Sequence, residues 1–194
     1  MQEASDRRES RHERVKSEIL DAAWDLARER GIGRFGLREL AATVGMKAPS
    51  LYQYFETKND LYDSMYRSAY LQLRERLERD GGQLDLTRSS IKETGRRYFD
   101  FCVEDPARYS LIFDKSLPFT PSAESVALAE QVAEVHVFGM LADLGVEDEE
   151  TVRLFIALGN GVVAQQHAYN PGGSDWLPVM DLAIDLFLDH IGLD

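Results

Sequence analysis

The chain has 194 residues, of which 44% are hydrophobic and 10% aromatic, and its formal net charge at pH 7 is −12. This composition excludes a disordered protein, and the single cysteine, Cys102, excludes an intramolecular disulfide framework and favours a reducing compartment. No run approaches the roughly 18 apolar residues of a membrane span, and the charged N-terminus lacks the hydrophobic region of a signal peptide, so we expect a cytoplasmic protein without membrane contact.

The negative charge is distributed unevenly along the chain. Of the 22 basic and 34 acidic residues, 15 and 15 fall within residues 1–80, which leaves 7 and 19 for residues 81–194. Salt screens surface charges beyond about 8–10 Å. The acidic surplus of the C-terminal part therefore does not exclude a nucleic-acid partner for the N-terminal part.

Residues 1–11 read as a disordered arm that mixes basic and acidic side chains. The arm is either a solvated tail or a segment that reaches a DNA minor groove. A first helix is predicted from Glu13 to Arg30, with Gly31 at its end. Its apolar residues recur at helical spacing: Val15, Ile19, Ala22 and Leu26.

Residues 36–61 predict two short helices joined by a tight turn. Leu37, Leu40 and Ala41 share one face of the first helix, and Gly45 ends it because glycine adopts a left-handed cap without steric cost. The second helix starts near Ala48, with Pro49 in its first turn. Two helices joined in this way form a helix-turn-helix, whose second helix enters the DNA major groove.

The same segment resembles the N-terminal signature of the TetR-type (TetR/AcrR) transcriptional repressors. The matching residues are Leu37-Arg38-Glu39-Leu40-Ala41, Gly45-Met46, Leu51-Tyr52-Gln53-Tyr54-Phe55, Thr57-Lys58 and Leu61. With the upstream helix, the resemblance covers about the first third of the chain. It implies a three-helix DNA-binding head, residues 12–57, followed by an effector-binding and dimerisation domain, residues 58–194. It also implies a homodimer that binds a palindromic operator and is released by a small-molecule effector.

Two positions depart from the family pattern. Gly36 stands where a hydroxyl side chain usually caps the helix, and Lys47 stands where a serine usually does. Seven residues are expected to contact DNA, with Gln53 as the best reader of a base edge. They are Arg38, Lys47, Ser50, Tyr52, Gln53, Tyr54 and Lys58.

Everything after the head is predicted to be helical, which makes the fold all-α with about nine helices in total. The predicted helices are Lys58–Arg79, Thr87–Glu104, 106–113, Ala123–Leu144, Glu147–Tyr169 and Gly173–Ile191. No alternating strand pattern and no internal repeat is present. The residues Asn170-Pro171-Gly172-Gly173 predict the turn before the last helix.

Aromatic and polar residues of the middle helices are candidates for contact with the effector, although each could equally belong to the core. The candidates are Tyr66, Tyr70, Phe99, Cys102, Phe113, His136, Met140, Asn160 and His167.

The last two helices predict a dimer interface, with the internal core as the alternative. The interface candidates are Ala157, Gly161, Ala164, Met180, Ile184, Phe187, Leu188 and Ile191. Asp181, Asp185 and Asp189 recur beside His190, and we interpret them as a solvated acidic face and not as a metal site. We expect neither a metal nor a cofactor.

The favoured function is therefore a ligand-responsive repressor. A constitutive DNA-binding regulator without an effector is one alternative, and a helical enzyme that carries the head is another. The chain has no HExxH, P-loop, nucleophile elbow or paired Cys/His zinc spacing, which argues against the enzyme.

Overall fold

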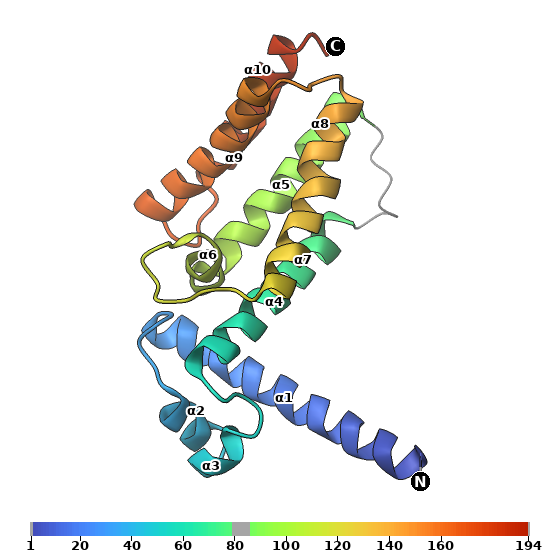
Figure 1. Ribbon diagram of the computed structural model, residues 1–194. Coiled ribbons are helices and arrows are strands. Elements are labelled where there is room, and N and C mark those ends of the chain that lie inside the picture. Colours follow the sequence, from blue (N-terminus) through green and yellow to red (C-terminus); the bar gives the residue numbers. More distant parts are fainter. Residues whose placement is uncertain (1, 79–85, 194) are drawn as a thin grey trace.

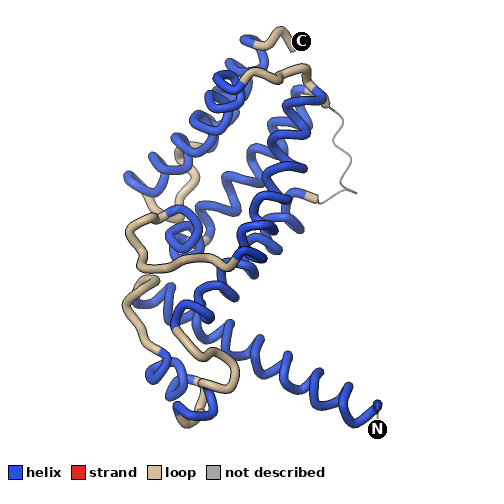
Figure 2. Tube along the Cα trace, in the orientation of Figure 1, coloured by secondary structure: helices blue, strands red, loops and turns tan. Residues whose placement is uncertain are grey.

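The computed structural model describes residues 2–78 and 86–193, and every regular element in them is a helix (Figure 2). The helices are α1 (Gln2–Arg30), α2 (Leu37–Thr43), α3 (Ala48–Leu51), α4 (Lys58–Leu77), α5 (Arg88–Glu104), α6 (Pro106–Phe113), α7 (Ala123–Ala133), a π-helix (Glu134–Phe138), α8 (Gly139–Asp143), α9 (Glu149–Tyr169) and α10 (Leu177–His190). Since α7, the π-helix and α8 are continuous, the described residues form nine separate helices. The predicted all-α fold class is confirmed.

Helices α1, α2 and α3 pack together at one end of the molecule as a three-helix head (Figure 1). Ile19 and Ala23 of α1 are buried there with Leu40 of α2 and Leu51 of α3. Beyond this contact α1 continues outward on its own toward the N-terminus (Figure 1).

The prediction of a disordered arm was wrong for residues 2–11, which form the first part of α1. Residues 2–30 contain neither glycine nor proline, so nothing in them interrupts a helix. Opposite charges four residues apart, such as Arg14 and Glu18 at 3.8 Å, also stabilise this helix.

The remaining helices form a larger body that α4 connects to the head (Figure 1). Helix α4 packs against α5, α6 and α7, and α10 packs against α5 and α9. Helices α9 and α10 lie side by side along one edge of the body (Figure 1). No helix in the described part of the chain is both long enough and apolar enough to cross a membrane.

Apart from the earlier start of α1, two further features differ from the predicted helices: the start of α10 and a π turn after α7. Thr57 accepts a hydrogen bond from the Asp60 amide in the predicted capping box. Helix α10 begins at Leu177 and not at Gly173, because the buried Gln166 side chain accepts a hydrogen bond from the Trp176 amide and holds the turn before the helix.

The second difference is the π-helix inside the predicted continuous helix Ala123–Leu144. The amide of Gly139 donates to the carbonyl of Glu134, five residues earlier. A Cβ atom at Gly139 would lie only 3.0 Å from that carbonyl oxygen, so glycine accommodates the widened turn. Single π turns of this kind are frequent at functional sites.

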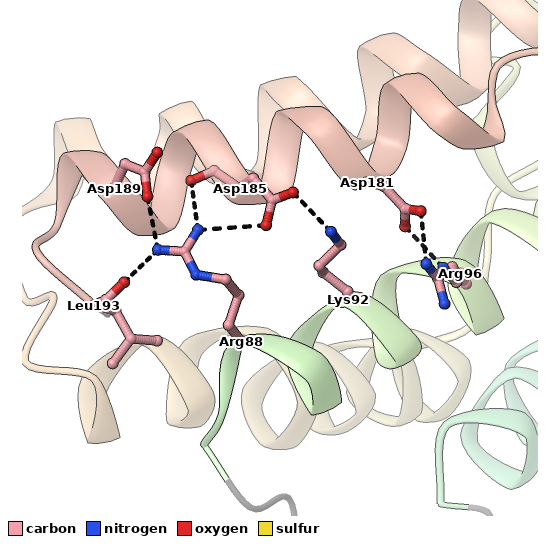
Figure 3. A network of polar contacts seen from close by, with 7 residues as sticks. All are labelled: Arg88, Lys92, Arg96, Asp181, Asp185, Asp189 and Leu193. Carbon is pink, nitrogen blue, oxygen red and sulfur yellow. Dashed lines mark hydrogen bonds and ion pairs between the residues drawn. The ribbon is translucent and has the colours of Figure 1, made fainter.

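The three aspartates of α10 are not a solvated acidic face, as the sequence suggested, but one side of an ion-pair ladder with α5 (Figure 3). Arg96 Nη2 lies 2.7 Å from Asp181, and Lys92 Nζ lies 2.7 Å from Asp185. Arg88 lies 3.3 Å from Asp185 and 2.7 Å from Asp189. The Lys92 ammonium, followed by the Arg88 guanidinium, holds the pKa of Asp185 below its usual value. Within the described residues no group of three or more His, Cys, Asp or Glu could hold a metal ion.

Candidate functional site

The turn between α2 and α3 has the geometry of a helix-turn-helix. Gly45 has φ +67°, the Met46 amide donates to Ala41 at 2.8 Å, and the Gly45 amide donates to Ala42 at 3.2 Å. These two bonds define a Schellman cap, which confirms the role predicted for Gly45. Leu51 and Phe55 are buried, so they fix α3 against the head.

Polar side chains on the outer side of this turn face solvent. Tyr52 is 42% exposed. Four others are exposed and make no hydrogen bond or ion pair with any residue that the structure describes: Arg38, Lys47, Ser50 and Gln53. We call these five side chains the recognition surface. Unpaired donors on a protruding turn are suited to phosphate and base edges.

The other two predicted DNA contacts are partly engaged inside the head. Tyr54 is half-buried and stacks on His12 of α1, with ring centroids 4.5 Å apart. Lys58 donates to the carbonyl of Gly33 at 3.0 Å, and its Nζ lies 5.2 Å from the centroid of the Tyr62 ring. These residues therefore lie at the margin of the recognition surface.

The two departures from the family pattern are visible as N-caps without side-chain hydrogen bonds. Gly36 (φ −126°, ψ 165°) begins α2 and Lys47 (φ −75°, ψ 142°) begins α3, both in extended conformation. Neither residue has a side-chain oxygen that could accept from an amide of the first turn. The Lys47 ammonium is left free to interact with an anion.

A cavity of about 240 Å³ that is partly open to solvent lies in the body, and α4, α5, α6, α9, α10 and the continuous helix that holds the π turn line it. Five of the nine predicted effector contacts line it: Tyr70, Phe113, His136, Met140 and Asn160.

The other four predicted contacts do not line the cavity. Phe99 and Cys102 are buried in the core, and Tyr66 packs against Tyr70 and Phe119. His167 stacks on Tyr109 with centroids 4.0 Å apart, and its Nε2 lies 3.1 Å from the Cys102 carbonyl.

Most of the lining that sequence reasoning did not identify is aliphatic or small. Thr94 and Gly95 of α5 face the cavity beside Ile184 of α10. A Cβ atom at Gly95 would lie 2.3 Å from the Ile184 side chain, so glycine permits this close packing. The pairing of a glycine with a bulky residue 89 positions later leaves no local signal in the sequence.

Two polar features reach the cavity. His136 is 6% exposed, and its Nε2 has no hydrogen-bond partner, although the Glu78 carboxylate lies 3.9 Å away. Burial lowers the pKa of His136, and Glu78 partly opposes this shift. On another wall, the Tyr98 hydroxyl donates to Asn160 Oδ1 at 2.6 Å.

The interface prediction was wrong for the apolar residues of α10. Met180, Ile184, Phe187 and Leu188 are buried within the chain itself, and Ile191 packs half-buried against the core. Phe187 contacts Phe155 of α9, with ring centroids 4.9 Å apart. These buried residues therefore belong to the internal core, which was the alternative prediction.

A different set of apolar residues on α9 and α10 faces outward. On α9 the predicted Ala157, Gly161 and Ala164 are indeed exposed. On α10 the exposed apolar residues are Val179, Leu182 and Leu186, the last two at 55% and 60%. We call these six residues, with the exposed Leu154, the α9–α10 outer face.

Polar contacts join the head to the body. Arg28 of α1 binds the carboxylate of Asp105 at 2.9 Å, and Asp105 caps α6 by accepting from the amides of Ala107 and Arg108. Near the start of α4, Asn59 exchanges two 3.0 Å hydrogen bonds with the backbone of Thr120. Helix α6 thus carries a head contact at Asp105 and a cavity residue at Phe113, eight positions later.

Comparison with known proteins identifies the head. The family described as "Bacterial regulatory proteins, tetR family" matches residues 19–65. The transcriptional activator FasR of Mycolicibacterium smegmatis is 27% identical over 145 residues, which cover 74% of this chain and 66% of FasR. The chain thus spans slightly less than two thirds of the length of this relative.

Solved structures share the fold over most of the chain. A tetR-family transcriptional regulator from Streptomyces coelicolor is similar with a TM-score of 0.70 and 22% identity, covering 91% of this chain and 80% of that one. FadR of Bacillus subtilis, solved in complex with stearoyl-CoA, gives a TM-score of 0.64 and 18% identity, with coverage of 88% and 96%. The matched family and FasR are transcriptional regulatory proteins, and the solved structures share the fold of this chain.

Proposed function

Because this chain belongs to the tetR family of DNA-binding bacterial regulatory proteins, we propose that it is a cytoplasmic repressor that binds a palindromic operator as a homodimer and is released by a small-molecule effector. The observation that carries the DNA-binding part is the recognition surface. Its side chains protrude from a helix-turn-helix and have no partners among the described residues. Gln53 is suited to pair with adenine, and Lys47 and Arg38 to bind phosphates.

We assign the proposed functions to the two parts of the chain that the packing of the helices distinguishes, the head and the body. Residues 12–57 read DNA, and residues 58–194 bind the effector and form the dimer. The α9–α10 outer face supports dimerisation, because a helix that is apolar on both faces needs a cover on each. A two-fold axis there would set two recognition surfaces about 34–36 Å apart, one turn of DNA.

The cavity supports the effector part of the proposal. It lies between helices and is lined mainly by apolar side chains with a few polar groups, as small-molecule sites are. An effector can release DNA only if it binds the DNA-free arrangement more tightly than the DNA-bound one. Helix α6 offers a physical link, since it has contacts to the cavity and to α1.

Selection of bound DNA from a random pool tests the DNA-binding proposal. We expect enrichment of a palindrome, and Tyr52→Ala should weaken binding to it by about tenfold or more, since aromatic contacts are worth about 1–3 kcal/mol. Tyr169→Ala, at an exposed tyrosine of α9, is the matched control and should bind as the parent does. A folded, dimeric protein that enriches no sequence at moderate salt would contradict the proposal.

A constitutive regulator without an effector is the second candidate. It would be favoured if no compound that fills the cavity changed the affinity for the selected operator. Binding in the cavity and release of DNA are therefore measured separately.

A further inference from the structure

The described residues that line the cavity include no aspartate, glutamate, lysine or arginine. The walls are formed mainly by aliphatic and aromatic side chains, such as Leu73, Ile91 and Phe155. Burying a carboxylate or phosphate among them without a cationic partner would cost several kcal/mol. The lining therefore favours an uncharged occupant.

His136 gives this occupant one defined polar contact. Its side chain is buried and lines the cavity from the π-helix, and its Nε2 lacks a hydrogen-bond partner. A buried polar atom without a partner is destabilising, so a ligand that supplies one gains affinity. A hydroxyl group can donate or accept, and it satisfies either tautomer of the ring.

The charges around His136 are unfavourable for an anion. The Glu78 carboxylate lies 3.9 Å from Nε2. Burial lowers the pKa of His136, which keeps the ring neutral near pH 7. No positive charge at this position would therefore compensate a ligand carboxylate.

Three cations of the cavity wall formed by α5 are already paired. Arg88, Lys92 and Arg96 lie on α5, which forms one wall, but their charged groups bind the three aspartates of α10 (Figure 3). The body around them is acidic, with 7 basic and 19 acidic residues in 81–194. This field repels polyanions such as a coenzyme A moiety.

We propose that the occupant of the cavity is an uncharged, mainly apolar small molecule whose hydroxyl or carbonyl group hydrogen-bonds His136. This proposal rests on the proposed effector function of the same cavity and specifies its ligand class. The volume of about 240 Å³ indicates a compact molecule, because small-molecule sites usually span roughly 300–1,000 Å³.

Titration calorimetry of the 194-residue chain without DNA tests the ligand class with three probes of one alkyl length: octanol, octanoate and octanoyl-CoA. At neutral pH octanol should bind, and the two anionic probes should bind about tenfold more weakly or worse. Tighter binding of octanoate or octanoyl-CoA than of octanol would overturn the proposal. So would failure of octanol to bind up to its solubility limit.

Variants locate the polar contact. His136→Phe should weaken octanol binding by about threefold to tenfold, whereas His136→Gln, which keeps a hydrogen-bonding group, should retain most of it. His167→Phe makes the same change at a histidine outside the cavity and is the matched control. Equal octanol affinity in His136→Phe and His167→Phe, both verified as folded by their melting curves, would exclude His136 as the contact.

Glu78→Gln tests the charge argument independently. Removal of this carboxylate should raise the affinity for octanoate relative to octanol, and an unchanged ratio would contradict the argument. Release of the selected operator is then measured with each probe. If octanol binds but releases no DNA, the effector function fails while the ligand class stands. If only octanoyl-CoA releases DNA, the effector function stands and the proposed uncharged ligand class fails.

Discussion

Single residues at the start of α3 decide how the head presents charge. The N-cap position holds Lys47, whose side chain cannot accept the hydrogen bonds that a serine would. In the first turn of α3, Pro49 has no N–H, and the amides of Ser50 and Leu51 donate to the Lys47 carbonyl. The exposed Lys47 ammonium is therefore the group at this helix start that a DNA phosphate would bind.

Lys47→Ser should therefore change the salt dependence of operator binding. The plot of log affinity against log salt should become less steep by about 0.9 per protomer, which corresponds to one lost phosphate contact. Fluorescence anisotropy with the selected operator over a range of salt concentrations measures this slope. Lys115→Ser, at an exposed lysine in the loop after α6, is the control and should leave it unchanged.

The contacts of His136 and His167 decide which of the two histidines lines the cavity. His136 and His167 were predicted as equivalent cavity residues, and burial lowers the pKa of both. Only His136 lines the cavity, because His167 is held by Tyr109 and the Cys102 carbonyl. The partners of a histidine, and not its residue type, determine its role.

At the scale of elements, α10 carries apolar residues on two faces. The inner face includes Met180 and Ile184, which line the cavity, and the outer face includes Leu182 and Leu186, which are exposed. The aspartates lie between these faces and bind α5. The ladder and the inner face together fix the orientation of α10, and the outer face stays exposed, where the proposed second copy of the chain would pack.

Leu186→Glu should accordingly abolish dimerisation without unfolding the protomer. A charge at the centre of an apolar interface costs several kcal/mol when desolvated, so the variant should be monomeric at micromolar concentration in sedimentation velocity. Its far-ultraviolet circular dichroism should match that of the parent. Leu71→Glu, on the exposed side of α4, is the control and should stay dimeric. A dimeric Leu186→Glu variant would show that the outer face is not the interface.

At the scale of the whole molecule, the cavity and the head are joined by a short series of contacts. Phe113 lines the cavity at the end of α6, Asp105 caps its start, and Arg28 connects Asp105 to α1. The Asp105 side chain is only 7% exposed, so this ion pair is more protected from solvent than most of the others. A shift of α6 would therefore be transmitted to α1.

Arg28→Gln should weaken this coupling and leave both binding sites intact. The operator affinity without ligand and the octanol affinity without DNA should each stay within about threefold of the parent. The difference between the octanol affinities with and without operator should shrink by about fivefold, within the usual range of allosteric coupling. Arg14→Gln, whose arginine pairs with Glu18 of the same helix, should retain the full difference. If both variants behave alike, Arg28 does not carry the coupling.

Local features of the chain were predictable from the sequence. The glycine turn at Gly45, the capping box of Thr57 and Asp60 and the burial of Leu51 and Phe55 were all confirmed. Each depends on backbone preferences and on residues within one or two helical turns. The head, and with it the resemblance to the tetR family, could therefore be recognised without coordinates.

Features that depend on distant partners became clear only in the folded chain. Helical spacing shows that α10 has apolar stripes but cannot show which one faces inward, since that depends on where α5 and α9 pack. The aspartates of α10 acquired partners 85–101 positions away on α5, and Gly95 acquired its neighbour Ile184 in the same way. Sequence periodicity records which residues share a face of a helix, whereas burial, ion pairing and access to the cavity depend on what that face meets.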